Sequence, residues 1–183
     1  MICGFGSVSV FSHPFMNITQ SSADFRVLFV CMGNICRSPT AHGVFEAKVR
    51  EAGLAGRVEV DSAGTHSYHV GAPPDARSQK HALLRGYDLS SQRARQLTAQ
   101  DFDDFDLVLV MDEDNLARAQ ALCPLQHAQK LRRFAEFFLH HDSPIVPDPY
   151  QGGSRGFEQV LDLVEDGSAG LLVHLMSQLE SRG

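Results

Sequence analysis

The feature that most constrains the fold of this chain is a short apolar run that passes through a polar loop into a helix start. Residues 26–30 read Arg-Val-Leu-Phe-Val, a β-branched and apolar run that predicts a buried central strand. Ser38 and Pro39 are a favourable N-cap and first-turn pair, so we expect a helix to begin there. Strand-like runs then alternate with helix-like stretches along the chain, which predicts a doubly wound α/β sheet.

The loop between this strand and this helix predicts a site for an oxyanion. Gly33 and Asn34 can both adopt positive φ, which curls the backbone and turns several N–H groups inward. A concave loop of inward N–H groups, closed by a helix N-terminus, binds phosphate or a similar anion.

Cys31 and Arg37 flank this loop and give it a chemical function. Inward N–H groups, a helix N-terminus and a guanidinium all favour the thiolate of Cys31 over the thiol. Such a sulfur can attack phosphorus while Arg37 grips two phosphoryl oxygens in a bidentate fork. The alternative is a buried cysteine and an unrelated surface arginine. It is disfavoured because the strand, glycine, cap and proline all fall where phosphoryl transfer needs them.

At this level of detail the sequence resembles the low-molecular-weight protein tyrosine phosphatases, in particular their bacterial-type members. The segments that carry the resemblance are residues 31–39, 61–65, 74–77, 94–97, 105–112 and 148–150. The resemblance implies a single-domain, open twisted sheet of four parallel strands in the order 2-1-3-4, with helices on both faces and the phosphate loop between the first strand and the first helix. It also implies hydrolysis of phosphotyrosine in proteins through a cysteinyl-phosphate intermediate, without a cofactor.

The resemblance assigns roles to the residues around the loop. The phosphate-binding and supporting residues are then Met32, Gly33, Asn34, Ile35, Cys36, Ser38 and Ser62. Among them, Ser62 is expected to hold Asn34 in its strained conformation, and Ser38 to hydrogen-bond the thiolate. Tyr68 and Tyr150 match the aromatic walls of the substrate slot, where a ring pair adds roughly 0.5 to 1.5 kcal/mol beyond burial.

A proline-rich stretch supplies the candidate acid. Residues 144–150 read Pro-Ile-Val-Pro-Asp-Pro-Tyr, and the prolines on either side of Asp148 restrict the backbone to a non-helical loop. Phosphoryl transfer from an aryl ester expels a phenolate of pKa about 10, so a positioned acid speeds that step. Asp148 fits this role, and as a carboxylate it can then activate water. The alternative is an ordinary turn aspartate.

The chain departs from the family pattern at three positions. His42 stands where the family commonly carries Glu, and it is either a solvated side chain or a residue that acts beside the loop. Gln92 stands where many members have His; its amide can preserve the support of the loop but not the pH response. Gln151 replaces a second aromatic residue that many eukaryotic members carry after Tyr150, which affects substrate preference.

Three alternative functions share some of these features. A protein-arginine phosphatase uses the same scaffold but tends to carry Thr where this loop has Ile35. An arsenate reductase needs a downstream cysteine relay, for which Cys123 is a lone candidate. A non-catalytic phosphotyrosine-binding module would need neither the nucleophile nor the acid.

The cysteines and histidines also limit the function. The chain has four cysteines without zinc-like spacing, which favours a reducing cytoplasm and a reactive thiol. Cys36 lies in the same loop as Cys31, so it can trap an oxidised Cys31 as a disulfide. A metal site could be built from His66, His69, His140, His141 and Asp142. We expect none, because these residues fall into distant pairs.

Charge and segment composition exclude other classes of partner. The net charge of −6 argues against nucleic acid or an anionic membrane surface, and no apolar run approaches the roughly 20 residues that span a bilayer. We expect a phosphotyrosine-containing protein as the partner, and similarity to bacterial members suggests a tyrosine autokinase. Residues 1–24 are expected to be an extension, poorly ordered or due to a start codon assigned too early, and residues 25–183 the phosphatase domain.

The rest of the chain predicts further elements of the sheet. Strands are expected at residues 57–61, 106–111 and 130–134, and helices at residues 75–84 and 112–123. Residues 62–65 are expected to form a turn. Residues 157–179 have helical periodicity, and we expect Gly167, Ser168 and Gly170 to break or bend that helix.

Overall fold

The computed structural model describes Met1 and residues 23–181, which form a four-stranded parallel sheet with helices on both faces. In chain order the elements are β1 (Phe25–Cys31), α1 (Arg37–Glu51), β2 (Val58–Gly64), α2 (Ala76–Leu84), α3 (Asp101–Asp104), β3 (Leu107–Val110), α4 (Glu113–Leu122), the 3-10 helix η1 (Leu125–Lys130), β4 (Leu131–Arg133), the 3-10 helix η2 (Phe134–Phe137) and α5 (Gly153–Ser181). The sheet order is β2-β1-β3-β4, which confirms the predicted fold class and strand order.

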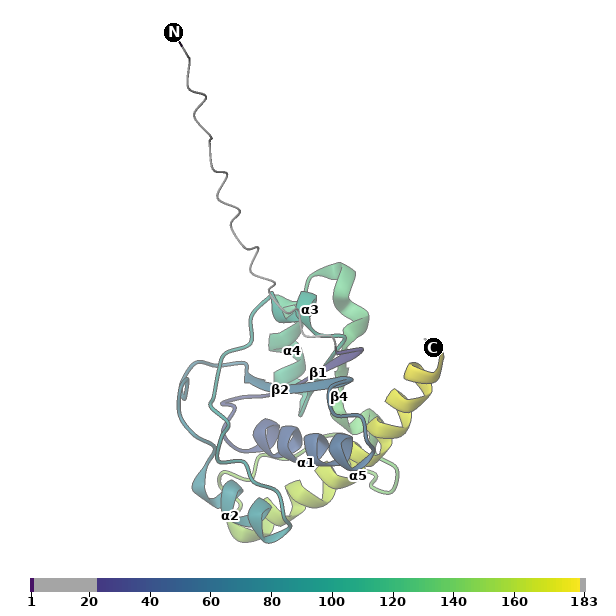
Figure 1. Ribbon diagram of the computed structural model, residues 1–183. Coiled ribbons are helices and arrows are strands. Elements are labelled where there is room, and N and C mark those ends of the chain that lie inside the picture. The colour runs from purple at the N-terminus through teal and green to yellow at the C-terminus, as the bar shows by residue number, and fades with distance from the viewer. Residues whose placement is uncertain (2–22, 182–183) are drawn as a thin grey trace.

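Strand β1 is apolar from Val27 to Cys31, where both faces of the sheet are covered. Helices α1, α2 and α5 lie on one face, and α3 and α4 lie on the other (Figure 1). Val27 and Phe29 belong to the core cluster beneath α1 and α5, whereas Leu28 and Val30 belong to the cluster on the opposite face. These alternating side chains are completely buried, as a central strand of a parallel sheet requires.

The chain order places the loop after β1 at a switch point of the sheet. From β1 the chain crosses to β2 on one side, and β3 lies on the other side of β1. The carboxyl ends of β1 and β3 therefore open onto one crevice, which is where open α/β sheets bind ligands. The other predicted strands and helices are confirmed to within one residue, apart from those discussed next.

Two boundaries near the loop differ from expectation. Helix α1 begins at Arg37 with Cys36 at the N-cap, so Ser38 is not the cap. The Ser38 hydroxyl instead turns toward the loop. Strand β2 continues to Gly64, so residues 62–64 are strand and not turn. Pairing with β1 extends to Cys31 opposite Gly64, where a Cβ atom would come within 2.9 Å of the Met32 carbonyl oxygen.

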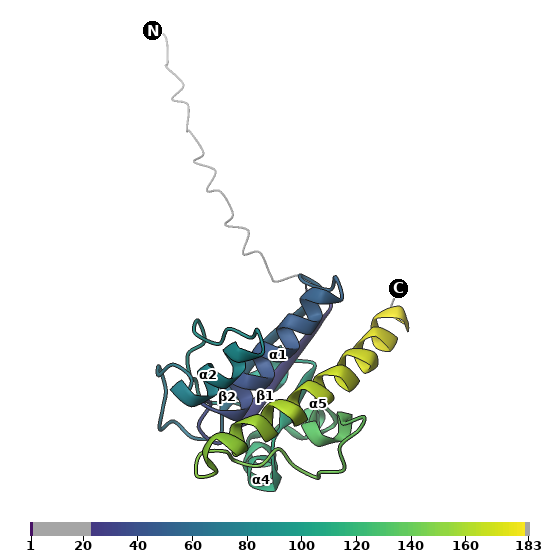
Figure 2. The ribbon, with the colours of Figure 1, turned by 90° about the horizontal axis from the view of Figure 1, so that it is seen from below.

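The predicted break in the last helix is wrong: α5 is one continuous helix that passes beside α1 (Figure 2). The glycines allow close packing instead of a bend. A Cβ atom at Gly167 would lie 2.7 Å from the Phe134 ring, and one at Gly170 would lie 2.0 Å from the Phe137 carbonyl oxygen. The propensity cost of glycine is therefore offset by the close approach of η2 to α5.

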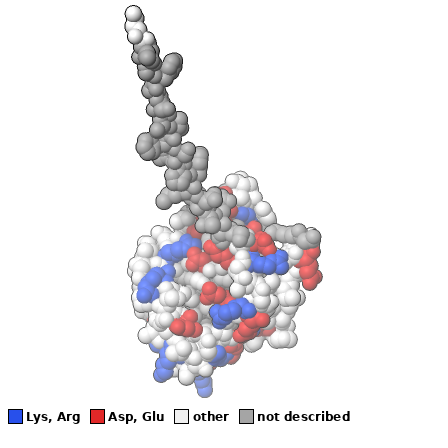
Figure 3. Space-filling view, in the orientation of Figure 1, with Lys and Arg blue, Asp and Glu red and all other residues white. Residues whose placement is uncertain are grey.

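None of the helices in the described part of the chain is long and apolar enough to cross a membrane. On the face shown in Figure 3, acidic and basic side chains are interspersed. The prediction for residues 1–24 falls almost entirely outside the described residues, although Asp24 is described and its carboxylate accepts a hydrogen bond from Arg57.

Candidate active site

The loop of residues 32–36 is held from the outside through its carbonyl groups. The carbonyl oxygen of Cys31 accepts from the Thr65 amide at 2.8 Å, and that of Met32 accepts from the His66 amide at 3.0 Å. In a trans peptide the N–H points away from the C=O of the same unit. The amides that follow these carbonyls therefore face the concave side of the loop, as an oxyanion site requires.

Asn34 has φ of 54° and is the only non-glycine residue with positive φ among those the structure describes. Three hydrogen bonds hold it there. Its Nδ2 donates to the hydroxyls of Ser38 and Ser62, each at 2.9 Å, and its Oδ1 accepts from the Arg95 amide at 2.9 Å. A residue in the left-handed region persists when its surroundings fix it there, and Asn34 is buried, with 2% of its surface exposed.

The Ser38 hydroxyl connects this support to the sulfur of Cys31. Ser38 Oγ lies 3.1 Å from Cys31 Sγ and 3.3 Å from the Ala63 carbonyl oxygen, and it already accepts from Asn34. Its single proton can be donated either to the Ala63 carbonyl oxygen or, at the shorter distance, to a Cys31 thiolate. This contact is what the resemblance implies for Ser38, and it explains why Ser38 is not available as a helix cap.

Arg37 is buried behind the loop, with 2% of its surface exposed. Its Nη1 donates to the Asp112 carboxylate and to the Val146 carbonyl oxygen at 3.2 Å, and its Nη2 donates to Asp148 at 3.2 Å. Burial opposes its charge, but Cys31, Asp112 and Asp148 outweigh that effect and raise the pKa of the guanidinium. Arg37 is therefore a permanent, oriented cation at the floor of the site.

Asp112 is a site residue that the sequence pattern did not predict. Its Oδ1 caps α4 by accepting from the Asn115 amide at 2.7 Å, while its Oδ2 binds Arg37. The available signal was its position directly after β3, because side chains at the carboxyl ends of neighbouring parallel strands meet in the crevice.

Asp148 reaches the site from a loop that is fixed at both of its ends. Before it, the Val146 amide donates to the Met111 carbonyl oxygen at 2.8 Å. After it, the Tyr150 amide donates to Asp148 Oδ1 at 3.1 Å. The Asp148 side chain is 46% exposed and faces Arg37. A carboxyl group that is half open to solvent can exchange protons with water as well as with a bound ligand.

These residues surround one cavity of about 400 Å³. Its lining is Cys31, Met32, Gly33, Ile35, Cys36, Arg37, Tyr68, His69, Asp148, Tyr150 and Gln151. Of the predicted site residues, only Asn34, Ser38 and Ser62 lie outside this lining, and they support it from behind. Tyr68 is 73% exposed, and its ring stacks on His66 with the ring centroids 5.0 Å apart.

The histidines considered for metal binding have other surroundings. His69 lines the cavity, where the Cβ of a larger residue at Gly33 would come within 2.9 Å of its ring. His141 Nδ1 lies 2.9 Å from Asp166 Oδ2, which also accepts the His140 amide. Across Met1 and residues 23–181, no group of three or more His, Cys, Asp or Glu side chains could hold a metal ion.

Of the two untypical residues near the loop, Gln92 contacts α1 and His42 lies within it. Gln92 Nε2 donates to the Pro39 carbonyl oxygen at 3.0 Å, so the amide does support the first turn of the helix. His42 is not a solvated side chain, because its Nδ1 is buried and has no hydrogen-bond partner among the described residues. Burial lowers the pKa of His42, Arg95 lowers it further, and Asp61 and Glu46 only partly oppose this.

We expect His42 to make the protein less stable in mild acid. The unfolded chain binds a proton at this side chain near pH 6.5, and the folded protein does so only at lower pH, so protons favour unfolding in between. The free energy of unfolding should fall below pH 6.5, by at most about 1.4 kcal/mol per pH unit from this group, and level off below the folded pKa.

Urea unfolding between pH 7.5 and pH 5 measures this effect. His42→Gln should lose less stability on acidification than the unsubstituted protein, while His140→Gln, at an exposed histidine, should follow the unsubstituted protein. Equal pH slopes for all three proteins would show that His42 does not contribute.

Comparison with known proteins places this cavity in a family. The family model described as low molecular weight phosphotyrosine protein phosphatase matches residues 26–181. A low molecular weight protein-tyrosine-phosphatase of Streptomyces coelicolor is 42% identical over 161 residues, which cover 86% of this chain and 98% of the relative. The enzyme YfkJ of Bacillus subtilis, with the same description, is 36% identical over 152 residues, which cover 83% and 96%.

A solved structure supports the same family assignment. The crystal structure of a protein tyrosine phosphatase from Entamoeba histolytica, with Hepes in the active site, has a TM-score of 0.82 at 38% identity, covering 84% of this chain and 98% of that one. The chain therefore belongs to the low molecular weight phosphotyrosine protein phosphatase family and is a protein-tyrosine phosphatase, an enzyme that hydrolyses phosphotyrosine in proteins.

Proposed function

We propose that this phosphatase works through a cysteinyl-phosphate intermediate, with Cys31 as the nucleophile, Arg37 as the phosphate clamp and Asp148 as the general acid and base. The observation that supports this most directly is that all three side chains line one cavity. Arg37 lies at its floor, and Asp148 stands at a half-exposed position beside it.

In the first step, the Cys31 thiolate attacks phosphorus and the bond from phosphorus to the tyrosine oxygen breaks. The loop amides and Arg37 bind the phosphoryl oxygens, and Ser38 donates a hydrogen bond that steadies the thiolate. Asp148, in its acid form, gives its proton to the departing phenolate, whose pKa of about 10 makes that proton necessary for fast departure.

In the second step, water hydrolyses the cysteinyl phosphate. The Asp148 carboxylate accepts a proton from the attacking water, the sulfur–phosphorus bond breaks, and inorganic phosphate and the Cys31 thiolate are released. Asp148 regains its proton and Cys31 its charge, so the cycle closes with water as the only co-reactant.

The aromatic side chains in the cavity lining support phosphotyrosine as the preferred substrate. Tyr68 and Tyr150 line its mouth, and an aromatic ring between them would stack on their faces. The phosphoryl group of phosphoserine is closer to the peptide backbone, so it would not reach the sulfur. Gln151 also lines this mouth, where it offers hydrogen bonds in place of another ring.

A panel of substrates tests this proposal against the alternatives. We expect the purified protein to hydrolyse a phosphotyrosine peptide with a kcat/KM at least about 100-fold above that for a phosphoarginine peptide. We expect no reduction of arsenate with thioredoxin. Preference for phosphoarginine, or arsenate reduction that depends on Cys123, would overturn the proposed specificity.

The physiological partner and the compartment are also proposals. We infer that the substrate is a phosphotyrosine-bearing protein, and we propose a tyrosine autokinase, by similarity to bacterial members of the family. We place the enzyme in the cytoplasm, because its mechanism needs Cys31 as a free thiol and because Cys31, Cys36 and Cys123 are all unpaired.

We expect Cys36 to protect the nucleophile from irreversible oxidation. Both cysteines line the same cavity, and burial raises the pKa of the Cys36 thiol to about 12, so Cys36 does not compete for phosphorus. Peroxide converts the Cys31 thiolate to a sulfenic acid; the Cys36 sulfur then displaces water to form a disulfide, which a thiol reductant reopens.

Activity recovered after peroxide and dithiothreitol measures this protection. Cys36→Ser should recover several-fold less activity than the unsubstituted enzyme, and Cys123→Ser should recover as much as the unsubstituted enzyme. Full recovery of Cys36→Ser would contradict a protective disulfide.

A further inference from the structure

Arg77 touches the rim of the cavity although it is not part of its lining. Its Nη1 donates to the Tyr150 carbonyl oxygen at 3.1 Å. Its guanidinium also lies over two rings, with the central carbon 5.1 Å from the Tyr150 centroid and 4.9 Å from the Phe157 centroid. One side chain thus holds both the backbone and the ring of Tyr150.

Arg77 is itself tied to the phosphate loop through Asp75. Its Nε and Nη2 donate to the two carboxylate oxygens of Asp75 at 3.0 and 2.8 Å, and this pairing lowers the pKa of Asp75. Asp75 caps α2, and its amide donates to the Ile35 carbonyl oxygen in the phosphate loop at 2.8 Å. The pair therefore spans from the phosphate loop to Tyr150.

Tyr150 in turn contacts the candidate acid. Its amide donates to Asp148 Oδ1 at 3.1 Å. Because the Asp148 side chain is 46% exposed, close packing does not fix its position. Beyond its pairing with Arg37, Asp148 is located by the contacts at the two ends of its loop. At one end Val146 is attached to Met111, which follows β3, and at the other end Tyr150 is attached to Arg77.

We propose that Arg77 is a positioning residue for the reaction: it holds Tyr150 as a wall of the slot and, through Tyr150, holds the Asp148 carboxyl group over the phosphate loop. This inference rests on the proposed role of Asp148 as the general acid. The positioning role differs from a purely structural one. If Arg77 only held α2 to α5, its loss would not alter the delivery of a proton to the leaving group.

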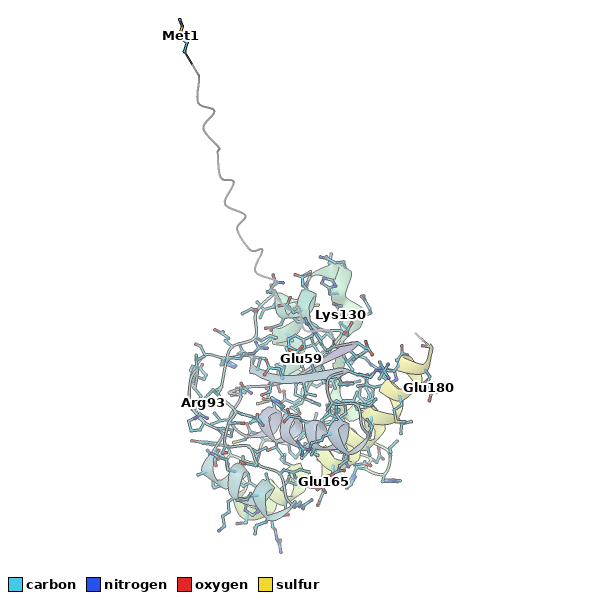
Figure 4. All side chains as sticks on the ribbon, viewed as in Figure 1. Met1, Glu59, Arg93, Lys130, Glu165 and Glu180 are labelled. Atoms are coloured by element: carbon cyan, nitrogen blue, oxygen red, sulfur yellow. The ribbon has the colours of Figure 1, made fainter. Side chains whose placement is uncertain are left out.

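The chain offers a matched control at the other end of α2. Arg85 donates to Asp162 and to Glu165, each at 2.8 Å, and to Glu158, and so ties the end of α2 to α5 through residues that do not line the cavity. Glu165 is marked on α5 in Figure 4. Arg85 has three carboxylate partners where Arg77 has one, so Arg85→Met removes more ionic contacts than Arg77→Met and reports the effect of lost stability without a change at Tyr150.

The experiment compares kcat/KM for two kinds of substrate, because this parameter includes the step in which the leaving group departs. One is a phosphotyrosine peptide, and the other is an aryl phosphate whose phenol is much more acidic and hardly needs a proton. The proteins are the unsubstituted enzyme, Arg77→Met, Arg77→Lys, Arg85→Met and Asp148→Asn, and thermal unfolding of each is measured in parallel.

We expect Arg77→Met to lower kcat/KM about tenfold for the phosphotyrosine peptide and less than about threefold for the acidic phenol ester. Arg77→Lys keeps a cation for Asp75 but loses the planar stack, so it should fall between the unsubstituted enzyme and Arg77→Met. Arg85→Met should leave the ratio of kcat/KM for the two substrates unchanged, even if this variant unfolds at a lower temperature.

Two results separate failure of this inference from failure of the proposed mechanism. Suppose that Asp148→Asn lowers kcat/KM more for the phosphotyrosine peptide than for the acidic phenol ester, but Arg77→Met lowers kcat/KM equally for both substrates. Arg77 then has only a structural role, and the inference is wrong. If Asp148→Asn itself lowers kcat/KM equally for both substrates, Asp148 is not the general acid. The proposed mechanism then fails together with the inference that depends on it.

Discussion

Cys31→Ser is expected to lower kcat/KM for a phosphotyrosine peptide by at least about 10³-fold, because a serine hydroxyl is not ionised near neutral pH and is a far weaker nucleophile than a thiolate. The substitution changes one atom in a buried position that is 3% exposed. The loop, Arg37 and the aromatic walls should therefore remain in place, and the variant should still bind inorganic phosphate.

Steady-state kinetics and phosphate titration by calorimetry measure the two halves of this expectation. Cys123→Ser is the matched control, because Cys123 is also a free cysteine but does not line the cavity, and its variant should keep full activity. Activity of Cys31→Ser within tenfold of the unsubstituted enzyme would mean that another group attacks phosphorus.

Arg37→Lys is expected to lower kcat/KM by about 10²- to 10³-fold. Lysine keeps the positive charge but cannot bind two phosphoryl oxygens in a fork, so the loss falls on the transition state, where those contacts are strongest. Stability should fall as well, by about 1 to 3 kcal/mol, because the Asp112 carboxylate and the Val146 carbonyl oxygen lose donors in a buried place.

The kinetic and stability effects of Arg37→Lys can be separated by a control at Arg93. That arginine is exposed, and within the described part of the chain it donates only to the carbonyl oxygens of Ser90 and Gln92; Figure 4 shows it at the edge of the molecule. Arg93→Lys should change neither kcat/KM nor the free energy of unfolding. An Arg37→Lys variant as active as Arg93→Lys would exclude a bidentate clamp.

The part of the site that could be predicted from sequence is local in the chain. Cys31 and Arg37 are separated by a loop whose conformation depends mainly on its own residues, Gly33 and Asn34, and on the elements at its ends. The strands were predictable for the same reason, since a strand buried on both faces is apolar at every position, as residues 27–30 are.

The parts that were missed depend on contacts between distant segments. Asp112 looks like an ordinary helix cap until β3 is placed beside β1 and its second oxygen meets Arg37. Gly167 and Gly170 have the composition of a helix break, and only the approach of η2 shows why they are glycines. Arg77 meets Tyr150 across 73 positions of the chain, a pairing that no local pattern encodes.

The measurement that tests the central claim most directly is chemical trapping of the intermediate. The enzyme is mixed with a phosphotyrosine peptide, quenched in acid within the first turnover, digested and analysed by mass spectrometry. The mechanism predicts a phosphoryl group on Cys31 whose amount rises and decays at rates consistent with turnover, and none in Cys31→Ser. Full turnover without such an adduct, or an adduct on another residue, would contradict attack by Cys31.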